Sequence, residues 1–166
     1  MARTIIGVIG SSEQFTDKQI YEFALNLGKE LSKAGYDIVC GGKGGIMEAV
    51  AQGVRTAGNS NAICIIPEDT KEAANPYCDI IIPSGMGLAR NILIVNTADI
   101  LIALGGGAGT LSEIAFAWQK GKKVLCVTAF EGWAKQLAGL AIDSRHNNLL
   151  KGVKSIQEIM QELNRQ

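Results

Sequence analysis

Three glycine-rich segments of the chain have the residue types needed to bind an anion. They read GSSE at 10–13, GGKGG at 41–45 and GGGAG at 105–109. Glycine allows positive φ angles and close approach of the backbone to a ligand. Where such a segment leads into a helix, the first N–H groups are unpaired and carry a partial positive charge. Brought together, these loops could hold a phosphate group.

Two charged side chains near these loops could add to the chemistry. Arg90 is a cation and Glu113 is a carboxylate. Each residue also has a purely structural interpretation. Residues 110–113, TLSE, have the form of a capping box, in which the carboxylate bonds to the Thr110 N–H. Arg90 could equally be a solvated helix arginine, and any one loop only a tight turn.

Familiar nucleotide-binding and hydrolase motifs do not match these loops. A G-x-G-x-x-G motif from Gly105 would require glycine at Thr110, and one from Gly42 would require glycine at Met47. Neither the Gly-Lys-Ser/Thr of a P-loop nor a G-x-S-x-G nucleophile elbow occurs. The sequence therefore argues against ordinary dinucleotide dehydrogenases, P-loop NTPases and α/β-hydrolases.

The loops are separated by alternating strand and helix patterns. Strands are expected at 4–9, 36–40, 61–66, 79–82, 99–104 and 123–127. Most of them are apolar at successive positions, as expected for strands covered on both faces. Helices are expected at 16–35, 46–58, 86–97 and 110–120, near Trp133, and from Ser155. Longer irregular stretches are expected at 67–78 and 142–152. This alternation predicts an α/β fold, a Rossmann-like doubly wound parallel sheet in three layers, with the loops at the ligand-binding edge.

Composition narrows the class of protein. The 166 residues predict one ligand-binding domain, 1–166, and the 16 basic and 16 acidic residues do not suggest binding to nucleic acid or to a membrane surface. Cys40, Cys64 and Cys126 lie in apolar runs, where a free thiol acts as a small hydrophobe. This cysteine usage predicts a reducing compartment, the cytoplasm, and no metal held by the protein. The lone histidine, His146, is expected in a surface loop.

The order and spacing of GGKGGIMEA, GMGLARN and LGGGAGTLSE resemble the Lonely Guy (LOG) superfamily, often labelled "possible lysine decarboxylase". The resemblance implies a Rossmann-like fold, and its enzymes cleave cytokinin riboside 5′-monophosphates into base and ribose 5-phosphate. It places the catalytic arginine on Arg90 and the catalytic glutamate on Glu113, should the chain be an enzyme. The lysine decarboxylase label finds no support in these residues.

The chain departs from the enzyme signature at three places, and these departures resemble a neighbouring branch, the molybdenum cofactor carrier proteins. Gly105 replaces a proline, Asn91 replaces a basic residue, and the first phosphate loop is one residue shorter. That branch binds the pyranopterin cofactor without transforming it and forms homo-oligomers. The candidate ligand-binding residues are Gly10, Ser11, Ser12, Gly41, Gly42, Lys43, Gly44, Gly45, Arg90, Asn91, Gly105, Gly106, Gly107, Ala108, Gly109 and Thr110.

Three functions follow as hypotheses. The first is a carrier that stores and protects the anionic molybdenum cofactor, or a similar nucleotide-like ligand. The second is a nucleoside 5′-monophosphate phosphoribohydrolase, although only one convincing carboxylate is present for a reaction that usually needs two. The third is a regulatory protein that senses a nucleotide. Helices 86–97 and 110–119 are apolar on more than one face, which predicts contact with another copy in a dimer or tetramer.

Overall fold

The alternation of strand and helix patterns produces a parallel sheet with helices on both faces. In the computed structural model, which describes residues 3–165, seven strands lie in the order β4-β3-β2-β1-β5-β6-β7, and every neighbouring pair is parallel. The strands are β1 (Ile5–Gly10), β2 (Asp37–Cys40), β3 (Ala62–Ile66), β4 (Ile80–Pro83), β5 (Ile100–Leu104), β6 (Val124–Val127) and β7 (Leu150–Val153). The predicted Rossmann-like fold class is confirmed.

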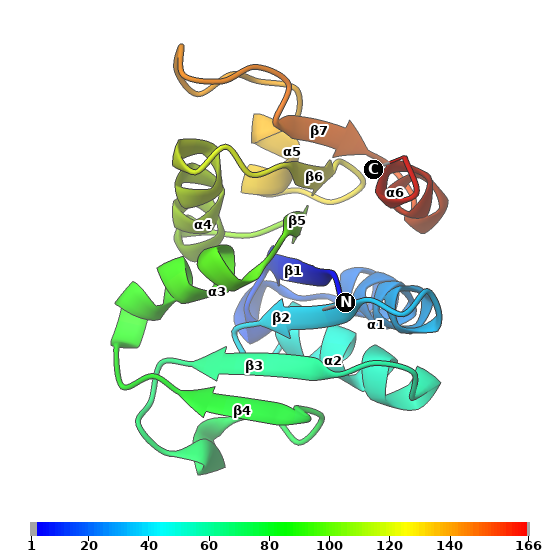
Figure 1. Cartoon of the computed structure of the whole chain (residues 1–166), viewed down its shortest axis with the longest axis vertical. Helices are drawn as coiled ribbons and strands as arrows, with labels where there is room; N and C mark the ends of the chain where they lie inside the picture. The colour runs from blue at the N-terminus through cyan, green and yellow to red at the C-terminus, as the bar shows by residue number, and fades with distance from the viewer. Residues whose placement is uncertain (1–2, 166) are drawn as a thin grey trace.

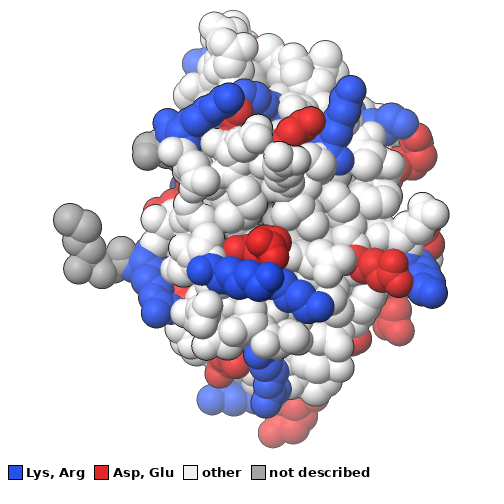
Figure 2. Space-filling view, turned by 90° about the vertical axis from the view of Figure 1, so that its right-hand side faces the viewer, with Lys and Arg blue, Asp and Glu red and all other residues white. Residues whose placement is uncertain are grey.

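The helices form the two outer layers. They are α1 (Lys18–Lys33), α2 (Ile46–Ala57), α3 (Asn91–Thr97), α4 (Ala108–Gln119), α5 (Trp133–Leu137) and α6 (Ile156–Leu163). Figure 1 shows α1, α2 and α6 on one face of the sheet and α3 and α4 on the other. On the face formed by α1, α2 and α6, acidic and basic side chains are interspersed, as Figure 2 shows.

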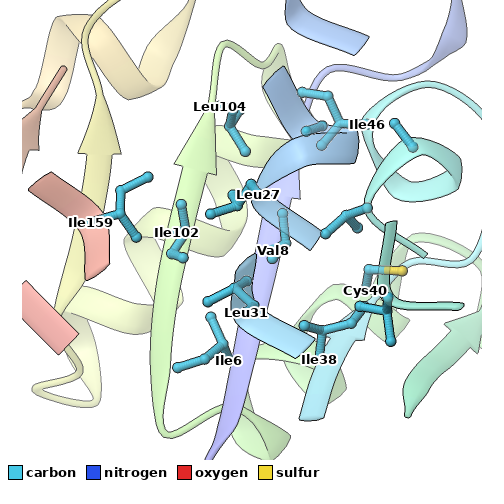
Figure 3. Close-up of a cluster of buried hydrophobic side chains, with 14 of the residues drawn as sticks. Ile6, Val8, Leu27, Leu31, Ile38, Cys40, Ile46, Ile102, Leu104 and Ile159 are labelled. Atoms are coloured by element: carbon cyan, nitrogen blue, oxygen red, sulfur yellow. The ribbon is translucent and has the colours of Figure 1, made fainter. Parts of the chain in front are cut away.

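Each face of the sheet has its own apolar core. Under α1, α2 and α6, aliphatic side chains such as Val8, Leu27 and Ile102 interdigitate, as in Figure 3. Under α3, α4 and α5, the second core is built around the fully buried Trp118 and Leu101. These two cores hold the strand ends in fixed positions, and the glycine-rich loops leave from those ends.

Helix boundaries follow the local signals in the sequence. The Asp17 side chain accepts a hydrogen bond from the Ile20 N–H at the start of α1. The predicted cap of the last helix is present, because the Ser155 hydroxyl accepts a hydrogen bond from the Glu158 N–H. At the end of α2, Gly58 takes the left-handed conformation that stops a helix without steric cost.

Three sequence predictions need correction. Within the expected irregular stretch 142–152 the strand β7 begins, because Leu150 and Val153 pack on the core while the two residues between them face solvent. Residues 86–97 form a 3₁₀ turn over Gly87–Arg90 followed by α3, not one continuous helix. The strand β4 is not covered on both faces; its Ile80 and Ile82 are exposed, because β4 is the edge of the sheet.

The interpretation of Cys64 as a free thiol is also wrong. Cys64 and Cys78 form a disulfide with a Cα–Cα distance of 5.8 Å, whereas Cys40 and Cys126 are free and buried. The sequence showed four cysteines but not that β3 and the segment before β4 are neighbours. Within residues 3–165, no helix is both long and apolar enough to cross a membrane.

Candidate functional site

The strand order creates a crevice at one edge of the sheet. The chain runs outward from β1 through β2, β3 and β4, then returns to place β5 beside β1. The loops that leave β1 and β5 therefore diverge, and ligands of doubly wound folds bind in the crevice between such loops. The hydroxyl of Ser11, after β1, accepts a hydrogen bond of 3.0 Å from the Gly106 N–H, after β5, which joins the two loops.

A cavity of about 230 Å³ lies in this crevice. It is bounded by the ends of β1 and β2, by the 3₁₀ turn before α3, and by the first turns of α4. Eight of the predicted site residues line it: Gly10, Ser12, Gly41, Arg90, Asn91, Gly109, Thr110 and Glu113. The structure thus brings together residues from four separate segments of the sequence.

Arg90 is the dominant charge in the cavity. Its side chain is not a solvated helix arginine, since the residue is only 9% exposed. Burial lowers the pKa of Arg90, and the nearby Glu113 opposes that shift. Among residues 3–165, no hydrogen-bond partner reaches its buried Nε atom. A buried guanidinium with an unpaired donor is costly, so it favours an anionic ligand that would accept from it.

Gly41 provides the space that Arg90 occupies. A Cβ atom at position 41 would clash with the Arg90 guanidinium and would lie 2.6 Å from the Met47 sulfur. Any larger residue at position 41 would therefore displace the arginine. This close approach is a physical reason for glycine directly after β2.

Glu113 also faces the cavity, which makes the capping-box interpretation wrong. Helix α4 begins at Ala108, so Thr110 lies inside its first turn and is not the cap. The Glu113 residue is only 6% exposed, and it lines the cavity. Burial raises its pKa to about 8, and the Arg90 charge opposes that shift. At neutral pH this carboxyl group mostly holds its proton.

Two helix N-termini add positive potential at the same edge of the sheet. Helix α4 has Gly107 as its cap and α2 has Gly45, and neither glycine has a side chain to accept a hydrogen bond. The first N–H groups of this 12-residue helix α4 have no side-chain cap, and Gly109 and Thr110 of its first turn line the cavity. At the start of α2, the Ile46 N–H donates a hydrogen bond to the Ser11 carbonyl, and this bond joins the loop after β2 to the loop after β1.

The remaining predicted residues lie beside the cavity instead of in it. Lys43 and Gly44 line a neighbouring hollow of about 490 Å³, and the Lys43 ammonium donates 2.7 Å hydrogen bonds to Glu68 and to the Ala73 carbonyl. A third hollow, of about 410 Å³, is lined by Ser11, Gly106 and Gly107. The predicted residues that line none of these three hollows are Gly42, Gly45, Gly105 and Ala108.

Asn91 has a structural contact in addition to its place at the cavity. Its side-chain amide donates a 3.1 Å hydrogen bond to the Ser112 hydroxyl, which joins the start of α3 to α4.

Two residues that line the cavity, Met47 and Leu88, were not predicted from the sequence. Their apolar side chains carry no signal of binding in the sequence, and only the fold shows that they face the ligand space.

Comparison with known proteins agrees with this geometry. A model of the SLOG cluster4 family matches residues 3–160. An uncharacterised protein of Archaeoglobus fulgidus is 43% identical over 119 residues, which make up 72% of this chain and 76% of that protein. The cytokinin riboside 5′-monophosphate phosphoribohydrolase LOG of Oryza sativa subsp. japonica is 37% identical over 95 residues, or 55% of this chain and 38% of the rice enzyme.

Two solved structures are similar over nearly the whole chain. The molybdenum cofactor binding protein of the phototrophic bacterium Rippkaea orientalis has a TM-score of 0.87 and 30% identity, and covers 99% of this chain and 98% of its own. The molybdenum cofactor carrier protein of Chlamydomonas reinhardtii has a TM-score of 0.84 and 25% identity, and covers 98% of each chain. Since the family model matches residues 3–160 of 166, and the motifs are those of LOG-like proteins, this chain belongs to the SLOG cluster4 family.

Proposed function

We propose that this protein binds and protects the molybdenum cofactor, or a similar anionic nucleotide-like ligand, without transforming it. The observation that carries the proposal is the buried Arg90 guanidinium, whose Nε has no hydrogen-bond partner among the described residues. It lies at a cavity beside the uncapped N-terminus of α4. A phosphate group would satisfy both the guanidinium and the helix amides at once.

The chemistry of the site fits a phosphate-bearing pterin. The terminal phosphate would lie between Arg90 and the first amides of α4. The cavity of about 230 Å³ is smaller than a typical small-molecule site, so the rest of the ligand would extend into the hollow lined by Lys43 and Gly44. No group of three or more His, Cys, Asp or Glu residues within 3–165 is arranged to hold a metal ion.

The similar solved structures support the same proposal. The Rippkaea orientalis and Chlamydomonas reinhardtii proteins are a molybdenum cofactor binding protein and a carrier, and both align with almost the whole chain. The Asn91 side chain is a neutral amide, hydrogen-bonded to Ser112, so this position lacks the positive charge of the enzyme signature. A binding protein does not need that charge for catalysis.

Substitution of Arg90 tests the proposal. We expect Arg90→Ala to weaken binding of the molybdenum cofactor by about tenfold or more, because a hydrogen bond to a charged group is lost from a buried site. The rate at which bound cofactor is lost to oxidation should rise accordingly. Arg145→Ala, which removes an exposed arginine, serves as the matched control and should protect the cofactor like the wild type. Protection no better than that given by an unrelated protein would refute the carrier function.

One observation favours a second candidate, the phosphoribohydrolase. With a pKa of about 8, Glu113 keeps a proton at neutral pH that it could donate to a leaving base. The rice LOG enzyme is also similar over 55% of this chain.

Incubation with AMP and related monophosphates would distinguish the carrier from the phosphoribohydrolase. Release of free base that disappears in Glu113→Ala and Arg90→Ala would establish the enzyme, whereas binding of nucleotide without turnover and without preference for pterin would indicate a sensor.

A further inference from the structure

The segment that precedes β4 holds the glycine loop 41–45 in place. The Asn75 N–H donates a 2.8 Å hydrogen bond to the Gly42 carbonyl, and the Asn75 side-chain amide donates one of 3.0 Å to the Lys43 carbonyl. The Lys43 ammonium in turn donates to the Ala73 carbonyl. Asn75 is 8% exposed, so these contacts are largely shielded from water. We call residues 71–78 the clamp.

The clamp is fixed to the sheet by the Cys64–Cys78 disulfide. Cys64 is buried on β3, and Cys78, which ends the clamp, is partly exposed. The disulfide also lies directly under the loop, because a Cβ atom at Gly42 would be 2.8 Å from the Cys64 Cβ. Disulfide, clamp and loop therefore form one continuous set of contacts.

A third sulfur atom lies next to this disulfide without joining it. Cys40 ends β2, immediately before the loop, and belongs to the buried cluster in Figure 3. Its Sγ is 3.9 Å from the Cys64 Sγ. Burial raises the pKa of Cys40 to about 11, so it stays a protonated thiol and attacks the disulfide only slowly. The disulfide therefore remains at Cys64–Cys78, and Cys78 is the less buried of its two residues.

We propose that the Cys64–Cys78 disulfide is a redox site through which a dithiol reductant loosens the clamp and weakens ligand binding at loop 41–45. A thiolate of the reductant attacks the Cys78 Sγ, and Cys64 leaves and takes up a proton. In the mixed disulfide, the first sulfur of the reductant is bonded to Cys78. The second thiol of the reductant then attacks that first sulfur and releases Cys78 as a thiol. Two electrons and two protons reach the protein, and the reductant becomes a disulfide. Only the effect on ligand binding rests on the proposed function.

Hydrogen exchange at the Asn75 amide tests the coupling without any ligand. Wild type is measured after air oxidation and after reduction with dithiothreitol. Cys78→Ser lacks the disulfide and is the test variant. Cys126→Ser keeps the disulfide, loses only a buried cysteine on β6 and is the control. Exchange at Asn75 should be about tenfold faster in reduced wild type and in Cys78→Ser under both conditions. Cys126→Ser should respond to the reductant as the wild type does. Equal exchange with and without the disulfide, or no crosslink in the oxidised protein by mass spectrometry, would overturn the proposal.

Binding of AMP to the same samples separates this proposal from the proposed function. We expect the dissociation constant for AMP to rise about threefold to tenfold on reduction of the wild type and in Cys78→Ser, because the loop must be ordered again on binding. AMP binding that is equal in the two redox states would overturn redox control and leave the ligand site intact. Exchange that rises on reduction while oxidised protein fails to bind AMP or pterin phosphate would support the coupling and refute the ligand site.

Discussion

Burial changes what the two charged residues of the site can do. In the sequence, Arg90 and Glu113 each have an ordinary structural explanation, as a solvated arginine and a capping glutamate. In the fold, both side chains are buried at one cavity, and the pKa of Glu113 rises to about 8 because water is excluded. Gly41 contributes by leaving room for the guanidinium. The chemistry of the site therefore depends on the surroundings of these residues as much as on their types.

The raised pKa of Glu113 predicts a specific pH dependence of stability. In the unfolded chain this carboxyl loses its proton near pH 4.5, whereas in the folded protein it loses it near pH 8. Between these values the folded state holds an extra proton, so its free energy of unfolding falls as pH rises. Glutamine does not titrate, so Glu113→Gln removes this fall in the free energy of unfolding. The variant should be more stable than wild type at pH 8 by on the order of a few kcal/mol.

Thermal unfolding measured across this pH range checks the prediction. The difference in Tm between Glu113→Gln and wild type should grow from pH 4.5 to pH 8. Glu22→Gln, on the exposed surface of α1, is the matched control and should show no such trend. A constant difference in Tm for Glu113→Gln would mean that this carboxyl titrates normally in the folded protein.

At the scale of the elements, short segments are stabilised by contacts from elsewhere in the chain. Helix α3 has only seven residues, too few to be stable alone. The Lys122 ammonium, from the turn before β6, donates hydrogen bonds to the Val95, Asn96 and Ala98 carbonyls at its C-terminus. A positive charge at that end also interacts favourably with the helix dipole. Since Arg90 directly precedes α3, this contact helps to position the site.

Substitution of Lys122 should therefore destabilise the protein. We expect Lys122→Met to lower the free energy of unfolding by about 1–3 kcal/mol, because three backbone carbonyls lose a charged donor. Lys120→Met changes an exposed lysine two residues away and should stay within about 0.5 kcal/mol of wild type. Urea denaturation followed by circular dichroism measures both. Equal stability of the two variants would show that water replaces the lysine without cost.

At the scale of the whole molecule, apolar side chains remain on one surface near the site. Leu88 is 89% exposed and Met86 is 45% exposed. Leu88 and Phe116 line an open hollow between the 3₁₀ turn and α4. Contiguous exposed apolar surface of this kind is typical of a contact between proteins. The expectation of a homo-oligomer, drawn from the apolar faces of helices 86–97 and 110–119, thus remains a prediction with a defined surface.

Leu88→Glu tests this surface. We expect wild type to be a dimer or tetramer at micromolar concentration, and Leu88→Glu to shift toward the monomer, because a charge would be buried at the contact. Leu140→Glu, which changes another exposed leucine in a different region, should keep the wild-type mass. Light scattering coupled to size exclusion measures all three. A monomeric wild type would refute the predicted assembly.

Local patterns in the sequence were enough to predict six of the strands, the long helices and the parallel sheet. Aliphatic runs, helix caps such as Ser155 and glycine-rich loops act over a few residues, so they can be read along the chain. The edge strand β7 escaped prediction, because it has two apolar positions separated by exposed ones. Its pairing with β6 forms only when the sheet assembles.

For the candidate site too, some features could be predicted from the sequence and others could not. The sequence by itself determined which segments could bind an anion and which family motifs they carry. Only the tertiary structure decided that Arg90 and Glu113 are buried at one cavity, that Lys43 pairs with Glu68, and that Cys64 and Cys78 are joined. These features depend on desolvation and on contacts between residues distant in sequence, and neither is set by local residue patterns.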